Sequence, residues 1–144
     1  MPGQDASERG GAASVEAAIL AIAVGLLIAL AIAGGRLVSA ESAADHAARA
    51  AARVASLQRD PATAQHLAVD AARRSLAEQG LACDALTVVV DTSEFGRPLG
   101  APGVARASVT CAVRWSDLGL PVVAGSREIA AEFVSPLDQL RERA

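Results

Sequence analysis

An uncharged apolar run near the N-terminus constrains this chain more than any other feature. Residues 17–35 contain no charged side chain and are rich in Leu, Ile, Val and Ala. A helix needs about 20 predominantly apolar residues to cross the hydrocarbon core of a bilayer. The run therefore predicts a single transmembrane helix over residues 12–38, preceded by a leader at residues 1–11, with the lipid bilayer as its first partner.

A cleaved signal peptide is the alternative interpretation of the same run. Signal sequences combine a basic start, about 7 to 15 apolar residues and a cleavage site of small residues. Here the leader is not basic, because the charge of Arg9 is outweighed by those of Asp5 and Glu8. The apolar run is also longer than in a signal peptide, and residues 38–40 (Val-Ser-Ala) resemble a cleavage site only weakly. A retained membrane anchor is therefore favoured over a secreted domain.

Length and charge limit what the remainder of the chain can do. The chain has 144 residues, a net charge of −3 and a sequence pI near 5.3, so nucleic-acid binding, which needs a basic surface, has no support. About 108 residues follow the span, enough for one small domain. No nucleophile motif, phosphate-binding loop or paired carboxylates are recognisable, so we expect a protein that is not an enzyme and has neither cofactor nor small-molecule substrate.

Histidines are the remaining candidates for a metal site. His46 and His66 each lie in a predicted helix, and neither stands near a Cys, Asp or Glu at a convincing ligand spacing. A metal site needs three or four converging ligands. Both histidines are therefore expected to be exposed helix residues, and no metal is predicted.

Glu16 opens the apolar run and has two interpretations. As an incidental acid near the end of a span, it extends to the lipid headgroups at little cost. Alternatively, cleavage after Gly11 would make Ala12 the first residue and Glu16 the fifth. A neighbouring subunit's carboxylate would then lie within reach of the new α-amino group. This arrangement is similar to the N-termini of type IV pilins, and it makes Glu16 a candidate subunit-pairing residue and a prepilin peptidase a possible partner.

An alanine-rich helical stalk is predicted over residues 39–58, continuous with the span unless the Gly34-Gly35 pair bends it. Glu41, Asp45, Arg49 and Arg53 recur every fourth residue and form a polar stripe. Another face shows heptad spacing, which suggests either a seam with another subunit or a cover for the protein's own sheet. Its residues are Ala43, Ala47, Ala50, Val54 and Leu57.

The remaining residues predict a small α+β domain over residues 59–136, followed by a tail at 137–144. Asp60-Pro61 is typical of a helix start, and Gly80 of a helix end after Gln79. Apolar and polar residues then alternate in strands at 86–91, 104–115 and 127–134. The fold class is therefore α+β: a long N-terminal helix, a second helix and a three-stranded antiparallel sheet, as in pilins. One or both helices must cover the sheet.

Alternation also predicts which strand residues face the core. Opposite this face, Arg106 and Arg114 are placed to pair with Glu128 and Glu132 across an antiparallel ladder. The expected inward residues are Ala107, Val109, Cys111, Val113, Trp115, Ile129, Ala131 and Phe133.

Cys83 and Cys111 are the two cysteines, and both follow the span. Outside the cytoplasm a disulfide is the natural prediction, and its 28-residue loop would stabilise the domain by about 3.5 kcal/mol. Two buried free thiols are the alternative. The positive-inside rule taken literally would place the C-terminus in the cytoplasm, because Arg36, Arg49 and Arg53 follow the span and only Arg9 precedes it. The cysteine pair argues for the outside, so the residues alone leave the orientation open.

The N-terminal part resembles the TadE-like family of tight-adherence (Flp) pilus assembly proteins. The resemblance rests on Arg9-Gly10, Val15-Glu16, Gly35-Arg36, Ala48-Arg49 and Ala52-Arg53. Ala17 replaces the usual Phe and the span has no Pro, so TadE-, TadF- and TadG-like subtypes stay open.

The resemblance implies a minor pilin or pseudopilin with a cytoplasmic N-terminus, an external C-terminal domain and other pilin-like subunits as partners. The alternatives are a membrane-anchored extracytoplasmic binding module that enters no pilus, and the secreted domain considered above.

Overall fold

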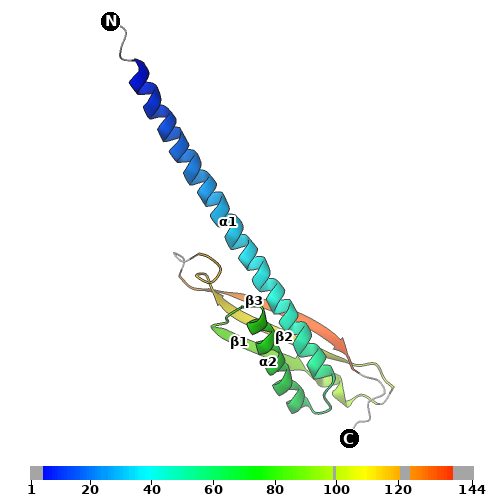
Figure 1. Ribbon diagram of the computed structural model, residues 1–144. Coiled ribbons are helices and arrows are strands. Elements are labelled where there is room, and N and C mark those ends of the chain that lie inside the picture. Colours follow the sequence, from blue (N-terminus) through cyan, green and yellow to red (C-terminus); the bar gives the residue numbers. More distant parts are fainter. Residues whose placement is uncertain (1–4, 99, 121–123, 138–144) are drawn as a thin grey trace. The chain divides into compact units, whose positions relative to one another are not determined.

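The computed structural model describes residues 5–98, 100–120 and 124–137, with side chains from residue 14 onward (Figure 1). The chain divides into two units, Met1–Gly35 and Arg36–Ala144, which are described in turn. The predicted tail lies outside the described residues except for Leu137.

The first unit consists of the beginning of helix α1 (Asp5–Ser56). This helix starts within the predicted leader, and Gly34 and Gly35 are both part of it. Its large apolar side chains between Val15 and Ile32 are 52% to 69% exposed. The helix is long and apolar enough to cross a membrane, and a surface of this kind is suited to lipid or to other apolar helices.

Helix α2 (Pro61–Glu78) begins at the predicted cap. The backbone N–H of Thr63 donates a hydrogen bond of 2.7 Å to Asp60 Oδ2, and Pro61 occupies the first turn. This backbone hydrogen bond lowers the pKa of Asp60 because it favours the ionised carboxylate. Sequence and structure agree on this start because the cap is a local interaction.

The end of α2 also follows local rules. Gly80 has φ +69, a left-handed conformation that glycine adopts without a steric penalty. The reversal lets the N–H of Leu81 donate to the carbonyl of Leu76 at 3.0 Å, closing the helix with a Schellman motif. Gln79, predicted as the last helical residue, is the C-cap.

The sheet has three antiparallel strands in the order β1-β2-β3: β1 (Ala85–Asp91), β2 (Val104–Arg114) and β3 (Ser126–Pro136). Val88 lies opposite Val109, and Val109 lies opposite Ala131. This confirms the predicted α+β class and the meander. The strands differ from the prediction by one or two residues at their ends, and Trp115, expected to be an inward strand residue, follows β2 and is half-buried.

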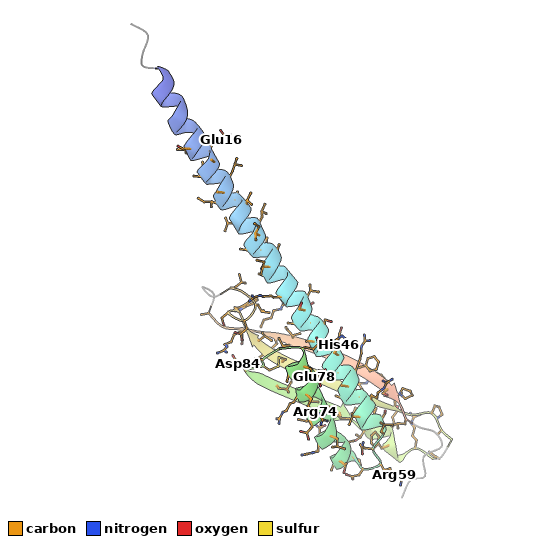
Figure 2. All side chains as sticks on the ribbon, viewed as in Figure 1. Glu16, His46, Arg59, Arg74, Glu78 and Asp84 are labelled. Carbon is orange, nitrogen blue, oxygen red and sulfur yellow. A yellow bond between two sulfur atoms is a disulfide. The ribbon has the colours of Figure 1, made fainter. Side chains whose placement is uncertain are left out.

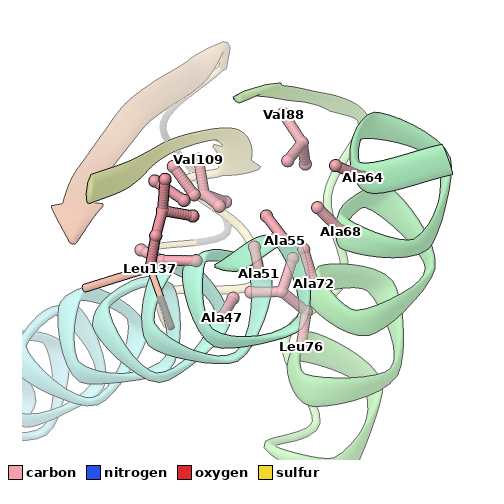
Figure 3. Packing of buried hydrophobic residues seen from close by; sticks show 14 of the residues in the cluster. Ala47, Ala51, Ala55, Ala64, Ala68, Ala72, Leu76, Val88, Val109 and Leu137 are labelled. Carbon is pink, nitrogen blue, oxygen red and sulfur yellow. The ribbon is translucent and has the colours of Figure 1, made fainter. Parts of the chain in front are cut away.

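Within the second unit, α2 and the C-terminal part of α1 both contribute to the core that covers one face of the sheet (Figure 3). The alternate residues Ala105, Ala107, Val109, Cys111 and Val113 of β2 are fully buried. The helices meet this face through alanine side chains that are almost completely buried. They are Ala40, Ala43, Ala44, Ala47, Ala48, Ala51, Ala52 and Ala55 of α1, and Ala64, Ala68 and Ala72 of α2.

Two features of this core were not expected from the sequence. Leu137, assigned to the tail, is buried at 4% exposure, and its N–H donates to the carbonyl of Gly103 at 2.8 Å. The hydroxyls of Ser56 and Ser135 share a buried hydrogen bond of 3.0 Å, which joins α1 to β3 and satisfies both polar groups.

The loop between β1 and β2 is more ordered than its Gly and Pro content suggested. It contains a short 3-10 helix, η1 (Ser93–Gly96), whose Phe95 is buried. Glu94 accepts a hydrogen bond from the N–H of Val104 at 2.8 Å and pairs with Arg97 at 3.1 Å. The Glu94 carboxylate thereby links η1 to the first residue of β2.

The alanine contact predicts sensitivity to added volume. Ala51→Leu should lower the free energy of unfolding by about 1 to 3 kcal/mol, because Ala51 is fully buried and extra methylenes displace its neighbours. Asp45→Leu, at an exposed position of the same helix, is the matched control. Thermal unfolding of the detergent-solubilised chain would measure both, and equal stability of the two variants would contradict the close packing.

Candidate functional site

Glu16 lies in the first unit, on α1. Its side chain is exposed and makes no hydrogen bond or ion pair with any residue that the structure describes (Figure 2). The apolar side chains nearest to it along the helix, Val15 and Ile19, are about 60% exposed. The carboxylate therefore stands alone on an apolar helix surface, where a cationic partner from outside this chain would find it accessible.

Gly11 and Ala12, the predicted processing site, belong to α1. Their surroundings lie outside the side chains that the structure describes, so the cleavage itself stays a prediction.

The predicted helix seam divides between the core and the surface. Ala43 and Ala47 are buried in the protein's own core, Ala50 and Val54 are half-buried, and Leu57 is 65% exposed. The heptad pattern drifts off the buried face because the helix packs on its own domain with the spacing of a straight helix. The continuous buried face instead passes through the alanines at 40, 44, 48, 51, 52 and 55.

The disulfide between Cys83 and Cys111 is formed, with the two Cα atoms 5.3 Å apart. Cys111 is fully buried on the covered face of β2, and Cys83 precedes β1. The bond confirms the predicted pairing and fastens the start of β1 to the central strand.

The predicted ion pairs across β2 and β3 are confirmed in one case and wrong in the other. Arg106 donates a hydrogen bond to Glu132, which raises the pKa of the Arg106 guanidinium by stabilising its charged form. Arg114 instead lies 3.5 Å from both Asp84 and Asp117. It does so because it ends β2, where the neighbouring loops bring acids closer than the strand partner does.

The histidines are exposed helix residues. His66 Nδ1 lies 3.6 Å from Asp70 Oδ2 one turn further along α2, an acidic neighbour that the sequence analysis did not recognise. Across the described part of the chain, no three His, Cys, Asp or Glu side chains come together in a way that would hold a metal ion.

Hollows lined by described residues lie on the second unit, and two of them are considered for a binding role. One, of about 210 Å³, includes Arg36 and Asp117 in its lining; the other, of about 350 Å³, lies beside the disulfide. The larger reaches only the lower end of the size range of small-molecule sites, and Arg73 is its one charged lining residue. Neither brings together a set of polar groups suited to catalysis.

Gln65 of α2 has a structural role that the sequence analysis missed. Its side-chain Nε2 donates to the carbonyl of Val88 at 2.7 Å, and its Oε1 accepts from the N–H of Val90 at 2.9 Å. The Gln65 amide therefore makes the same two hydrogen bonds to β1 that the backbone of one residue in a parallel neighbouring strand would make. A lone polar residue on an amphipathic helix gives no signal in sequence for such a contact.

Comparison with known proteins finds a match over part of helix α1. Residues 11–53 match the family model of TadE-like proteins. The TadE-like match begins at the predicted processing site, includes Glu16 and the apolar helix, and ends within the buried alanine face of α1. It confirms the resemblance seen in the sequence over these residues. No curated protein and no solved structure matches the chain.

Loss of the Gln65 amide should weaken the edge of the sheet. Gln65→Ala leaves the Val88 carbonyl and Val90 N–H without their partner, so we expect the free energy of unfolding to fall by about 1 to 3 kcal/mol. His66→Ala, at the exposed neighbouring position, is the control. Denaturant unfolding would measure the difference, and indistinguishable midpoints would show that the edge does not depend on Gln65.

Removal of the disulfide should destabilise the domain. Because the bond closes a 28-residue loop, Cys83→Ala combined with Cys111→Ala should lower the free energy of unfolding by about 3.5 kcal/mol. Reduced and oxidised wild-type protein, unfolded in the same denaturant series, provide the matched comparison. Detection of two alkylatable thiols in non-reduced protein would contradict the bond.

Proposed function

We propose that this protein is a membrane-anchored, pilin-like structural component of a tight-adherence pilus assembly system, a minor pilin or pseudopilin without enzymatic activity. The observation that carries the proposal is the TadE-like match over residues 11–53. The match falls on a helix long and apolar enough to cross a membrane. The TadE-like family itself points to tight-adherence pilus systems in general.

The position of Glu16 supports a role in subunit assembly. In the first unit the carboxylate is exposed on an apolar helix surface and has no partner among the described residues. A charge in such surroundings gains stability when an opposite charge lies close to it, because the medium is of low dielectric constant. The α-amino group that cleavage after Gly11 would create supplies this charge in the proposed assembly.

The proposed orientation places the N-terminus in the cytoplasm and the second unit outside. The Cys83–Cys111 bond supports an external domain, because structural disulfides persist in oxidising compartments and are rare in the cytosol. The small cystine-linked domain would then remain attached to the membrane, or to the fibre, through α1.

The pairing role of Glu16 has a direct test. Glu16→Ala and Glu16→Gln should both reduce co-purification with other pilin-like subunits, because each removes the negative charge. Glu16→Asp keeps the charge on a shorter side chain and should preserve part of the co-purification. Glu41→Ala, which removes an exposed acid from the second unit, should have no effect. Quantitative pull-down from membranes would measure the recovered partners. Recovery of as much partner protein by the Glu16→Ala variant as by the wild type would contradict the proposal.

Mapping the N-terminus separates the alternatives. N-terminal sequencing by mass spectrometry of membrane-extracted protein should find Ala12 first if a prepilin peptidase acts after Gly11. A chain starting at Met1 would favour an uncleaved membrane-anchored module. A start near Ser39 would favour a secreted domain and overturn the anchor.

A further inference from the structure

The two edges of the sheet differ in whether their outward backbone groups are hydrogen-bonded. Along β1, the edge carbonyl of Val88 and the edge N–H of Val90 are both bonded to the Gln65 side chain. An added strand would have to displace these hydrogen bonds. The protein itself therefore blocks the centre of the β1 edge.

The register shows which backbone groups lie at the other edge. Because Val88 directs its carbonyl away from β2, its partner Val109 directs its backbone groups toward Ala131 on β3. Alternation along an antiparallel strand then directs the groups of the neighbouring residues outward. These residues are Glu128, Ala130, Glu132 and Val134, and within the described part of the chain no hydrogen bond occupies their outward backbone groups.

The side chains of these four residues lie on the face of the sheet opposite the helices. Directly opposed residues share a face, and Ala131 shares the covered face with Val109. Glu128 and Glu132 are therefore two exposed acids, four residues apart, at an unbonded edge. Arg106 from β2 forms an ion pair with Glu132, whose side chain remains half exposed, whereas Glu128 has no ion pair with any described residue.

This charge pattern disfavours a second copy of the chain as the occupant. Two β3 strands related by a two-fold axis would be antiparallel, and residues of the same face would oppose each other. The open face of β3 offers Ser126, Glu128, Ala130, Glu132 and Val134, none of which is basic. A copy could therefore bring only uncharged residues or another acid to Glu128.

We propose that the free edge of β3 binds an extended segment of a different protein chain, with Lys or Arg side chains opposite Glu128 and Glu132. Main-chain hydrogen bonds to the outward groups of β3 would supply affinity, and the two basic side chains would set the register. This inference rests on the sheet alone and does not depend on the pilus function.

The test uses the full chain in lipid nanodiscs and two synthetic peptides. Both are alternating Thr-Val peptides of about nine residues, with two residues four apart on one face replaced by Lys in one peptide and by Glu in the other. Fluorescence anisotropy should give a Kd for the Lys peptide about tenfold lower than for the Glu peptide. Amide exchange should show new protection at residues 128, 130, 132 and 134.

Two variants separate backbone recognition from charge recognition. Ala130→Pro removes an outward N–H without breaking the β2–β3 ladder and should abolish binding, whereas Ala130→Thr keeps that N–H and should retain it. Glu128→Lys should reverse the preference between the two peptides. This second variant keeps the test decisive if the proline variant fails to fold.

Three results would overturn the inference. The first is equal affinity for the two peptides, or no binding of either, in which case the acids serve only to keep other strands away from the edge. The second is protection of the Val88 and Val90 amides instead of those on β3. The third is concentration-dependent self-association of the peptide-free protein with protection of the same β3 amides, which would make a second copy the occupant.

Discussion

The close approach of two helices to one face of a small sheet, made possible by alanine, is the constraint on which the second unit depends. The buried positions of α1 and α2 are almost all alanines, and Val109, Val113 and Cys111 are the largest fully buried side chains. A methyl group buries little area, so each contact contributes little hydrophobic stabilisation. What alanine provides is proximity, with the sheet and both helices packed at short range (Figure 3).

A core of this kind needs help from interactions that do not depend on large side chains. The Cys83–Cys111 bond reduces the conformational entropy of the unfolded chain, and the Ser56–Ser135 hydrogen bond satisfies two buried polar groups. Gln65 forms hydrogen bonds with backbone groups at the edge of β1 that no strand pairs with. Each acts between elements that are distant in sequence. Together they fix the sheet beneath helices that present few apolar atoms to it.

The parts of this structure that local chemistry controls were predictable from the sequence. The Asp60 cap, the Gly80 termination, the cysteine pairing and most of the strand alternation appeared as expected. Phe133, expected among the inward residues, is 37% exposed beside Arg49. Three features escaped prediction because they depend on distances between elements. Gln65 of α2 forms hydrogen bonds with β1, and Arg114 lies close to acids in the loops instead of to an acid on β3. Leu137, which follows β3, is buried in the core. For the candidate site, the TadE-like segment was recognisable from residue pairs near the apolar run, whereas the edge of β3 required the register.

A sheet with one closed edge can grow in only one direction. Because the Gln65 amide is bonded to β1, this chain can accept an added strand only at β3, and its own sheet offers no second edge for a further subunit. Strand pairing among copies of this chain alone would therefore stop at a pair and would not propagate a fibre. A repeating polymer built from copies of this chain would need contacts other than its sheet edges, and the exposed apolar surface of α1 is the surface of this chain suited to them.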